Sequence, residues 1–265
     1  MKLPPLQGNL DQDRFFMYAA CDHEYFDQFG PTLIASIKQN TTCGVHLHLY
    51  NPSAEQIKYC RNQPRVSITF ESATLELFEP ASAPWLTPPE DPELLVTYKR
   101  IVNAMGKGND TSIQQRIQRT YFACARFIRL QQLIHQNSSV LAIDVDAIVR
   151  GNIPVLSTDQ DLYIHRIEKK NPRFLAGGIY LPGTYSGYQF LKEYANALKN
   201  AIEQDTLHWG IDQDLLENIV PKYRWGAIPK ELIDWEMSPT SCIWTAKGTR
   251  KSADIFVNEL KKYKS

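Results

Sequence analysis

The stretch VLAIDVDAIVRGNIP, residues 140–154, carries the features that decide which fold the sequence predicts. Its first four residues are apolar and predict a short buried strand that ends at Asp144-Val145-Asp146. Side chains two residues apart on an extended chain point to the same side, so the carboxylates of Asp144 and Asp146 are expected to converge. Two like charges held together call for a cation, and ligands that are all oxygen favour Mg²⁺ or Mn²⁺. The stretch therefore predicts a divalent metal site at the end of a strand.

A solvated turn with two acidic residues is the competing interpretation of this tripeptide. Most isolated Asp-x-Asp tripeptides are of that kind, because the pattern is short and common. Here apolar residues stand on both sides of it, VLAI before and Ala147-Ile148-Val149 after. The buried setting that they predict favours the metal site over the solvated turn.

The chain on the N-terminal side alternates between strand and helix patterns. Strands are predicted at 15–21 (FFMYAAC), 45–50 and 66–70, with helices at 29–39 and around Ile57 and Tyr59 between them, and a long helix at 111–136 leads into the strand at 140–143. Strands that alternate with helices form a parallel sheet, and ligands bind at the carboxyl ends of such strands. Asp22, Asp144 and Asp146 all follow predicted strand ends.

The chain on the C-terminal side continues the α/β pattern. Strands are predicted at 161–164 and 178–181, and helices at 188–202 and 212–219. Residues 79–93, which include five prolines, and the glycine-rich residues 106–110 predict surface loops. No linker divides the chain, so residues 1–265 are expected to form one α/β domain, a mixed and mostly parallel sheet flanked by helices.

Composition argues against several classes of protein. Lys and Arg number 29, as do Asp and Glu, and this zero net charge argues against a general affinity for nucleic acid. No stretch approaches about 18 apolar residues, so no membrane span is expected, and the N-terminus lacks the apolar core of a signal peptide. Five scattered cysteines without a CxxC pattern argue against disulfides or a zinc site and favour a cytoplasmic protein.

Several segments, in the right order along the chain, resemble motifs of the GT-A-fold glycosyltransferases, and glycosyltransferase family 8 is the most similar. Beside the acidic tripeptide, these are residues 16–22 for the first strand, 121–127 for the helix that carries Arg126, 174–179 for an FNxG strand, 209–216 for a DQDxLN helix start and 245–251 for an HxxGxxK loop. Two positions depart from the pattern. Thr245 stands where the loop usually has histidine, and Ala176 or Gly177 stands where asparagine is usual.

This resemblance implies a GT-A-like, Rossmann-type fold, with a nucleotide-binding half at 1–150 and a half for acceptor and sugar at 151–265. It also implies transfer of a sugar, with retention of its anomeric configuration, from a nucleotide-diphosphate donor that is expected to be UDP-linked. Mn²⁺ or Mg²⁺ held by Asp144 and Asp146 would neutralise the charge of the departing diphosphate. The acceptor, a glycan, a lipid or a protein, is left open.

The motifs also assign roles to particular residues. Asp212 and Gln213 are the expected catalytic residues beside the reacting carbon, although Asp212 also suits a helix cap. Gly248 lets the backbone approach a phosphate that Lys251 is expected to bind, and the planar guanidinium of Arg126 suits either the carboxylates or the phosphate. The other expected donor-binding residues are Ala20, Asp22, Asp144, Val145, Gly177 and Gly178.

Two residues keep two interpretations each. Asp22 is expected either to bind ribose or base, or to cap the helix that follows it. Trp209 is either a wall on which a sugar ring stacks or a packing residue in front of a helix.

Three other kinds of protein are compatible with parts of the pattern. A haloacid-dehalogenase-like phosphatase has the same tripeptide after a strand, but normally near the start of its catalytic domain. A sugar nucleotidyltransferase would carry a glycine-rich loop with Lys or Arg near the N-terminus, and residues 15–30 show none. A non-catalytic protein that binds a nucleotide sugar is the third, and Thr245 in place of histidine gives it weight.

Overall fold

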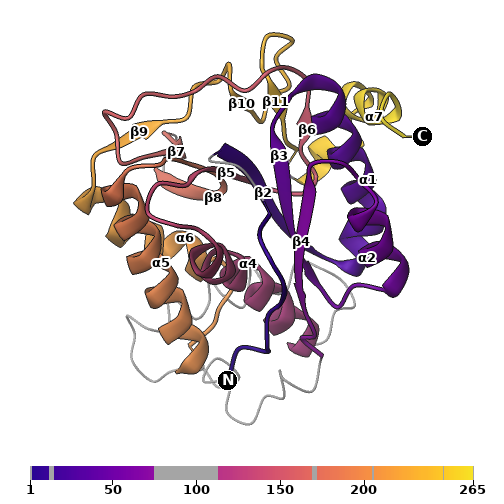
Figure 1. The fold of residues 1–265 in the computed structure, drawn as a ribbon. Helices are drawn as coiled ribbons and strands as arrows, with labels where there is room; N and C mark the ends of the chain where they lie inside the picture. The colour runs from indigo at the N-terminus through magenta and orange to yellow at the C-terminus, as the bar shows by residue number, and fades with distance from the viewer. Residues whose placement is uncertain are drawn as a thin grey trace.

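A central sheet of eight strands runs through the part of the chain that the computed structural model describes, which is residues 2–11, 15–74, 113–168, 172–204, 206–246 and 248–264. The strand order is β1-β4-β3-β2-β5-β8-β7-β9 (Figure 1). The strands are β1 (Gln7–Gly8), β2 (Phe15–Asp22), β3 (Gly44–Tyr50), β4 (Val66–Glu71), β5 (Ser139–Ile143), β7 (Leu162–Ile167), β8 (Arg173–Pro182) and β9 (Trp225–Ala227).

Parallel strands build the centre of this sheet. β2 pairs in parallel with β3 and β5, and β3 pairs in parallel with β4, whereas β8 is antiparallel to both β5 and β7. The predicted mixed and mostly parallel sheet is therefore confirmed. Because Tyr18 in β2 pairs with Ala142 in β5, the chain leaves both strands at the same edge, toward Asp22 and Asp144.

Helices cover both faces of the sheet (Figure 1). One group is α1 (His23–Asn40), α2 (Ala54–Arg61) and α7 (Asp254–Lys261), and the other is α4 (Ile113–Leu133), α5 (Tyr185–Glu203) and α6 (Ile211–Ile219). Successive side chains of β2 point to opposite faces of the sheet. Phe16 and Tyr18 belong to the hydrophobic cluster under α4–α6, and Met17 and Ala19 belong to the cluster under α1 and α7. A fully buried strand of this kind reads as a continuous apolar run, as FFMYAAC does.

Local sequence signals explain where the helices begin. The Asp22 carboxylate accepts a hydrogen bond from the Tyr25 backbone N–H (2.8 Å), so α1 begins at His23, earlier than the predicted start at residue 29. Ser53 and Gln56 form a capping box at the start of α2. Thr184 caps α5 in the same way as Asp22 caps α1.

A second, three-stranded sheet brings the C-terminal part of the chain to the acidic tripeptide. β6 (Ile148–Val149) begins just after Asp146 and pairs antiparallel with β11 (Ile243–Trp244), which pairs in parallel with β10 (Ile233–Asp234). From β11 the chain continues into the short 3-10 helix η4 (Gly248–Ser252) and then into α7. The acidic tripeptide and the expected phosphate loop therefore become neighbours.

The acidic tripeptide lies in a turn, because the backbone N–H of Ala147 donates to the carbonyl oxygen of Asp144 (3.1 Å). The tripeptide is therefore not extended, as the sequence argument assumed, and tertiary contacts orient its two carboxylates. The predicted loops at 79–93 and 106–110 lie outside the described residues, as does Lys247. Among the described helices, none combines the length and hydropathy that a bilayer crossing requires. All five cysteines are free thiols.

Candidate functional site

A cleft of about 510 Å³ opens at the carboxyl ends of β2 and β5, a volume in the usual range of small-molecule sites, about 300–1,000 Å³. Of the residues expected from the sequence, those that line it are Ala20, Asp22, Arg126, Asp144, Val145, Asp146, Gly177, Asp212, Gln213, Gly248 and Lys251. Gly178 is not among the lining residues, and a Cβ there would meet Trp235, Ile233 and Ile228. The fold therefore brings together residues from most of the length of the chain.

Asp144 is held by a cation from α4. Arg126 donates through Nη1 to Asp144 Oδ1 (2.6 Å) and through Nη2 to the carbonyl oxygen of Ala176 (3.0 Å). Burial by itself would lower the pKa of Arg126, but the charges of Asp144 and Asp212 outweigh it and raise that pKa. Arg126 is therefore a permanent cation at the cleft, and the Asp144 side chain, 40% exposed, remains open to a ligand.

Asp146 is held by a cation from the C-terminal part of the chain. Its Oδ2 forms an ion pair with Lys251 Nζ (2.5 Å) and accepts a hydrogen bond from the Tyr25 hydroxyl (3.3 Å). Lys251 also donates to the Tyr25 hydroxyl, and its Nζ lies 4.8 Å from the centre of the Tyr25 ring. Burial and the neighbouring charge of Asp144 raise the pKa of Asp146, and Lys251 opposes that rise.

Two oxygen atoms of the tripeptide are suited to a divalent ion. Asp146 Oδ1 is buried and has no hydrogen-bond partner among the described residues, and Asp144 is open to the cleft. Within the described ranges no group of three or more His, Cys, Asp or Glu is placed to hold a metal, and Thr245 is a buried cleft residue where the family pattern has histidine. Two carboxylates with these free oxygens are a ligand set that could hold Mg²⁺ or Mn²⁺.

Asp212 and Gln213 enter the cleft from the first turn of α6. The helix begins after Gly210, whose left-handed backbone (φ 92°) turns the chain there, and Gln213 N–H donates to the Gly210 carbonyl (3.0 Å). Asp212 is buried, and burial raises the pKa of its carboxyl group while Arg126 opposes the rise. A buried carboxyl group beside the cleft is a candidate for chemistry, because such shifts gather at functional sites.

Trp209, just before α6, lines the cleft and is 55% exposed. That exposure excludes the interpretation of Trp209 as a packing residue. The turn that presents it is held by polar contacts of Asp214, whose carboxylate meets His208 Nε2 (3.1 Å) and Arg173 Nη2 (3.4 Å). An exposed aromatic ring at a cleft is one on which the apolar face of a ligand could stack.

Two other expected residues contribute geometry to the site. Asp22 caps α1 and also lines the cleft, so the two interpretations of this residue are compatible. Gly177 lies against Asp144, since a Cβ on Gly177 would stand 2.6 Å from Asp144 Oδ2. Any residue with a Cβ at position 177 would therefore displace the Asp144 carboxylate.

Sequence reasoning missed several residues of the cleft. Tyr25 is a direct partner of Asp146. Arg119 lines the cleft from α4, and Trp235 lines it while stacked on His165, with ring centres 3.8 Å apart. No local pattern marks these residues, because their neighbours in the cleft come from distant parts of the chain.

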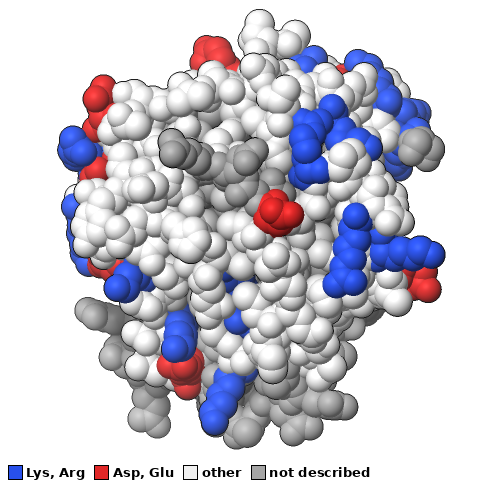
Figure 2. Space-filling model, in the orientation of Figure 1, with Lys and Arg blue, Asp and Glu red and all other residues white. Residues whose placement is uncertain are grey.

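Charge is spread unevenly over the molecule despite a formal net charge of zero. Figure 2 shows that Lys and Arg side chains gather on the side of this face where α1, α2 and α7 lie in Figure 1. In the cleft itself, two acids, Asp144 and Asp146, are each matched by a cation, Arg126 and Lys251. The cleft therefore combines separate positive and negative groups that a charged ligand and a metal ion could share.

Neither the known protein families nor the curated protein sequences contain a match to this sequence. Solved structures do resemble it. The glycosyltransferase GlyE of Streptococcus pneumoniae TIGR4 is 12% identical with a TM-score of 0.52, and the match covers 94% of this chain and 60% of GlyE. The bifunctional glycosyltransferase WbbM is 12% identical with a TM-score of 0.53, over 95% of this chain and 50% of WbbM.

An active-site mutant of LgtC is similar over 93% of each chain, at 12% identity and a TM-score of 0.50. The chain thus spans 60% of the length of GlyE and half of WbbM. These likenesses show that the chain has the GT-A fold of glycosyltransferases.

Proposed function

We propose that this chain is a metal-dependent glycosyltransferase that moves a sugar from a UDP-linked donor, with retention of configuration, to a glycan, lipid or protein acceptor. One observation carries the proposal. In a GT-A fold, Asp144 and Asp146 of the acidic turn are ion-paired with Arg126 and Lys251, and all four residues line one cleft. A diphosphate and a divalent ion are ligands of complementary charge for that arrangement.

Asp144 and Asp146 would hold Mn²⁺ or Mg²⁺, which when bound supplies a Lewis acid for the departing diphosphate. Arg126 orients Asp144 through their ion pair (2.6 Å). The ammonium group of Lys251 pairs with Asp146, and a donor diphosphate would compete for it. Gly248 has a left-handed backbone (φ 61°), and no atom of the described residues lies within 4 Å of the place that a Cβ would take there. This leaves room for a phosphate beside Lys251.

The sugar would lie toward α6, where Asp212 and Gln213 line the same cleft as the acidic turn. Developing positive charge on the sugar is stabilised by a nearby carboxylate or amide oxygen. Asp212 is buried near Arg126, and Gln213 follows it in the first turn of the helix. We assign these two residues to the reacting carbon, and Ala20, Asp22 and Val145 to the nucleotide.

Thermal unfolding with Mn²⁺ and UDP tests the donor and the metal together. Saturating UDP with Mn²⁺ is expected to raise the Tm by roughly 5 °C, because a ligand that binds only the folded state stabilises it by mass action. The double variant Asp144→Asn, Asp146→Asn should lose this shift. Asp159→Asn, at an exposed acid outside the cleft, is the matched control and should keep it.

The absence of a shift with any nucleoside diphosphate and metal would contradict the proposal. If UDP binds, activity assays distinguish a glycosyltransferase from the other candidate functions. Release of free sugar or transfer to an acceptor is expected of a glycosyltransferase, and pyrophosphate release from a sugar phosphate and UTP would identify a nucleotidyltransferase. Binding of UDP without any turnover would indicate a non-catalytic protein.

A further inference from the structure

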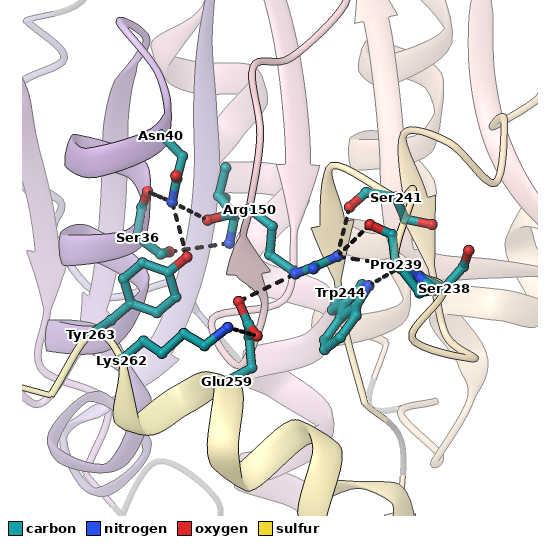
Figure 3. Close-up of polar contacts among 11 residues, drawn as sticks. Ser36, Asn40, Arg150, Ser238, Pro239, Ser241, Trp244, Glu259, Lys262 and Tyr263 are labelled. Atoms are coloured by element: carbon teal, nitrogen blue, oxygen red, sulfur yellow. Dashed lines mark hydrogen bonds and ion pairs between the residues drawn. The ribbon is translucent and has the colours of Figure 1, made fainter.

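A set of polar contacts behind the cleft joins the strand after the acidic turn to the end of the chain (Figure 3). Val149 in β6 is bound through both backbone groups: its N–H donates to Ser36 Oγ (3.1 Å), and its carbonyl accepts from Asn40 Nδ2 (2.9 Å). Asn40 Nδ2 also donates to the hydroxyl of Tyr263, just after α7 (3.0 Å). Helix α1 therefore fixes β6 and the end of the chain in one place.

Arg150, the next residue, binds the loop in front of β11. Its backbone N–H donates to the carbonyl oxygen of Cys242 (2.6 Å). Its Nη1 donates to three further carbonyl oxygens of that loop, those of Ser238 (3.4 Å), Pro239 (3.2 Å) and Ser241 (3.2 Å). A guanidinium suits this task, because its donors are fixed in one plane.

The same guanidinium also contacts β11 and α7. Its Cζ lies 3.7 Å from the centre of the Trp244 ring, a cation–π contact. Its Nε donates to Glu259 Oε1 in α7 (3.3 Å), and the other oxygen of Glu259 is bound by Lys262 (2.7 Å). Lys251 lies in η4, and Arg150 contacts the chain on both sides of η4, at β11 before it and at α7 after it.

We infer that Arg150 is a positioning residue, which sets the distance between Lys251 and Asp146. Arg150 does not line the cleft, so its influence on a ligand passes through the segment that it holds. From Trp244 that segment runs through Thr245 and Ala246, which do line the cleft, to η4. The inference rests on the proposed function in one respect: it assumes that Lys251 binds the diphosphate of the donor.

Calorimetric titration of UDP in the presence of Mn²⁺ tests this role. Arg150→Met keeps most of the side-chain length and removes the donors, and it is expected to raise the Kd for UDP roughly tenfold, as loss of an orienting contact does. Lys251→Met should raise the Kd as well. In the double variant the two effects should not add, because both act through the same contact. Arg150→Lys should give an intermediate Kd, since an ammonium lacks the fork of donors.

Hydrogen exchange gives a readout that needs no ligand. The amides of residues 245–264 are expected to exchange faster in Arg150→Met than in the wild type, because the contacts on both sides of η4 are lost. Arg224→Met is the matched control: Arg224 pairs with Asp161 (3.0 Å) outside the cleft, and its loss should change neither the Kd nor exchange at 245–264.

The outcomes separate the inference from the proposed function. Wild-type protein that binds no UDP would overturn the proposed function, and hydrogen exchange would still test Arg150. A Kd for Arg150→Met equal to that of the wild type, or additive effects in the double variant, would overturn the inference. If Arg150→Met does not fold, Arg150→Lys and Glu259→Gln carry the same test with smaller perturbations.

Discussion

The two carboxylates of the acidic tripeptide differ in their surroundings although one residue separates them. Asp144 is open to the cleft and pairs with Arg126 from α4, whereas Asp146 is buried and pairs with Lys251 near the C-terminus. A metal ion that binds both must therefore share them with two cations that are already in place. Gly177 also bears on the position of Asp144, because a Cβ there would stand 2.6 Å from Asp144 Oδ2.

Gly177→Ala tests how far the site depends on the position of Asp144. The new Cβ would stand 2.6 Å from Asp144 Oδ2, closer than non-bonded atoms approach, so the carboxylate must move. We expect Mn²⁺-dependent UDP binding to weaken by roughly tenfold or more, as misplaced ligands of a metal site cause. Gly151→Ala is the control, since its nearest neighbour would be 3.6 Å away, and equal Kd values for the two variants would contradict the prediction.

At the scale of elements, the start of α6 decides where the expected catalytic pair stands. Gly210 has φ 92°, and a Cβ there would have only Arg173 Nη2 within 4 Å among the described residues, at 3.9 Å. Replacement of Gly210 therefore meets backbone strain rather than a clash. Asp212 and Gln213 follow within the first turn, so a change of the backbone at Gly210 moves both.

Gly210→Ala is expected to destabilise the fold by about 1–2 kcal/mol, the usual cost of a left-handed backbone for a residue with a Cβ. It should also lower the turnover of a UDP-sugar while UDP affinity changes little, because the acidic turn is a separate element. Urea unfolding and steady-state rates measure the two effects. Gly210→Asn is the control, since asparagine tolerates this conformation better, and an equal loss in both variants would count against backbone strain as the cause.

At the scale of the whole molecule, the sheet contains buried histidines that make its stability depend on pH. His46 bonds Ser67 Oγ (2.8 Å) and Thr69 Oγ1 (2.9 Å), and His48 bonds the same Thr69 oxygen (3.0 Å). Burial lowers the pKa of His46 to about 3 and that of His48 well below its usual value. Both side chains are therefore neutral in the folded protein.

This burial sets the sign of the pH dependence. Below about pH 6.5 the unfolded chain binds protons at both histidines and the folded chain does not, so the free energy of unfolding falls as the pH falls from about 6.5 toward 3. Each histidine contributes a slope of about 1.4 kcal/mol per pH unit. Urea unfolding from pH 7 to pH 5 should show this slope develop as the histidines of the unfolded chain become protonated.

His46→Gln should reduce the slope by about 1.4 kcal/mol per pH unit, the contribution of one proton. Glutamine can keep the hydrogen bonds to Ser67 and Thr69 but does not titrate. His135→Gln, at an exposed position, is the control and should leave the slope unchanged. A slope that is the same in all three proteins would show that other groups govern the acid sensitivity.

Local patterns in the sequence determined the elements of this protein and the place of its acidic turn. The run FFMYAAC, the alternation of VHLHLY and the helical spacing after residue 113 each became the element that they predict, because side-chain periodicity is a property of neighbouring residues. The order of motifs likewise indicated the fold that solved structures share. Apolar residues on both sides of Asp144 and Asp146 also indicated that the acidic turn follows a buried strand.

Only the tertiary structure decided which groups face each other across that cleft. Tyr25 lies 121 residues from Asp146 and 226 from Lys251, and no period or motif links residues at such separations. The same holds for Arg150 and α7, for the fit of Gly177 against Asp144 and for the exposure of Trp209. Hydrogen bonds and ion pairs need atoms within a few ångströms, and chain folding alone brings such distant residues that close.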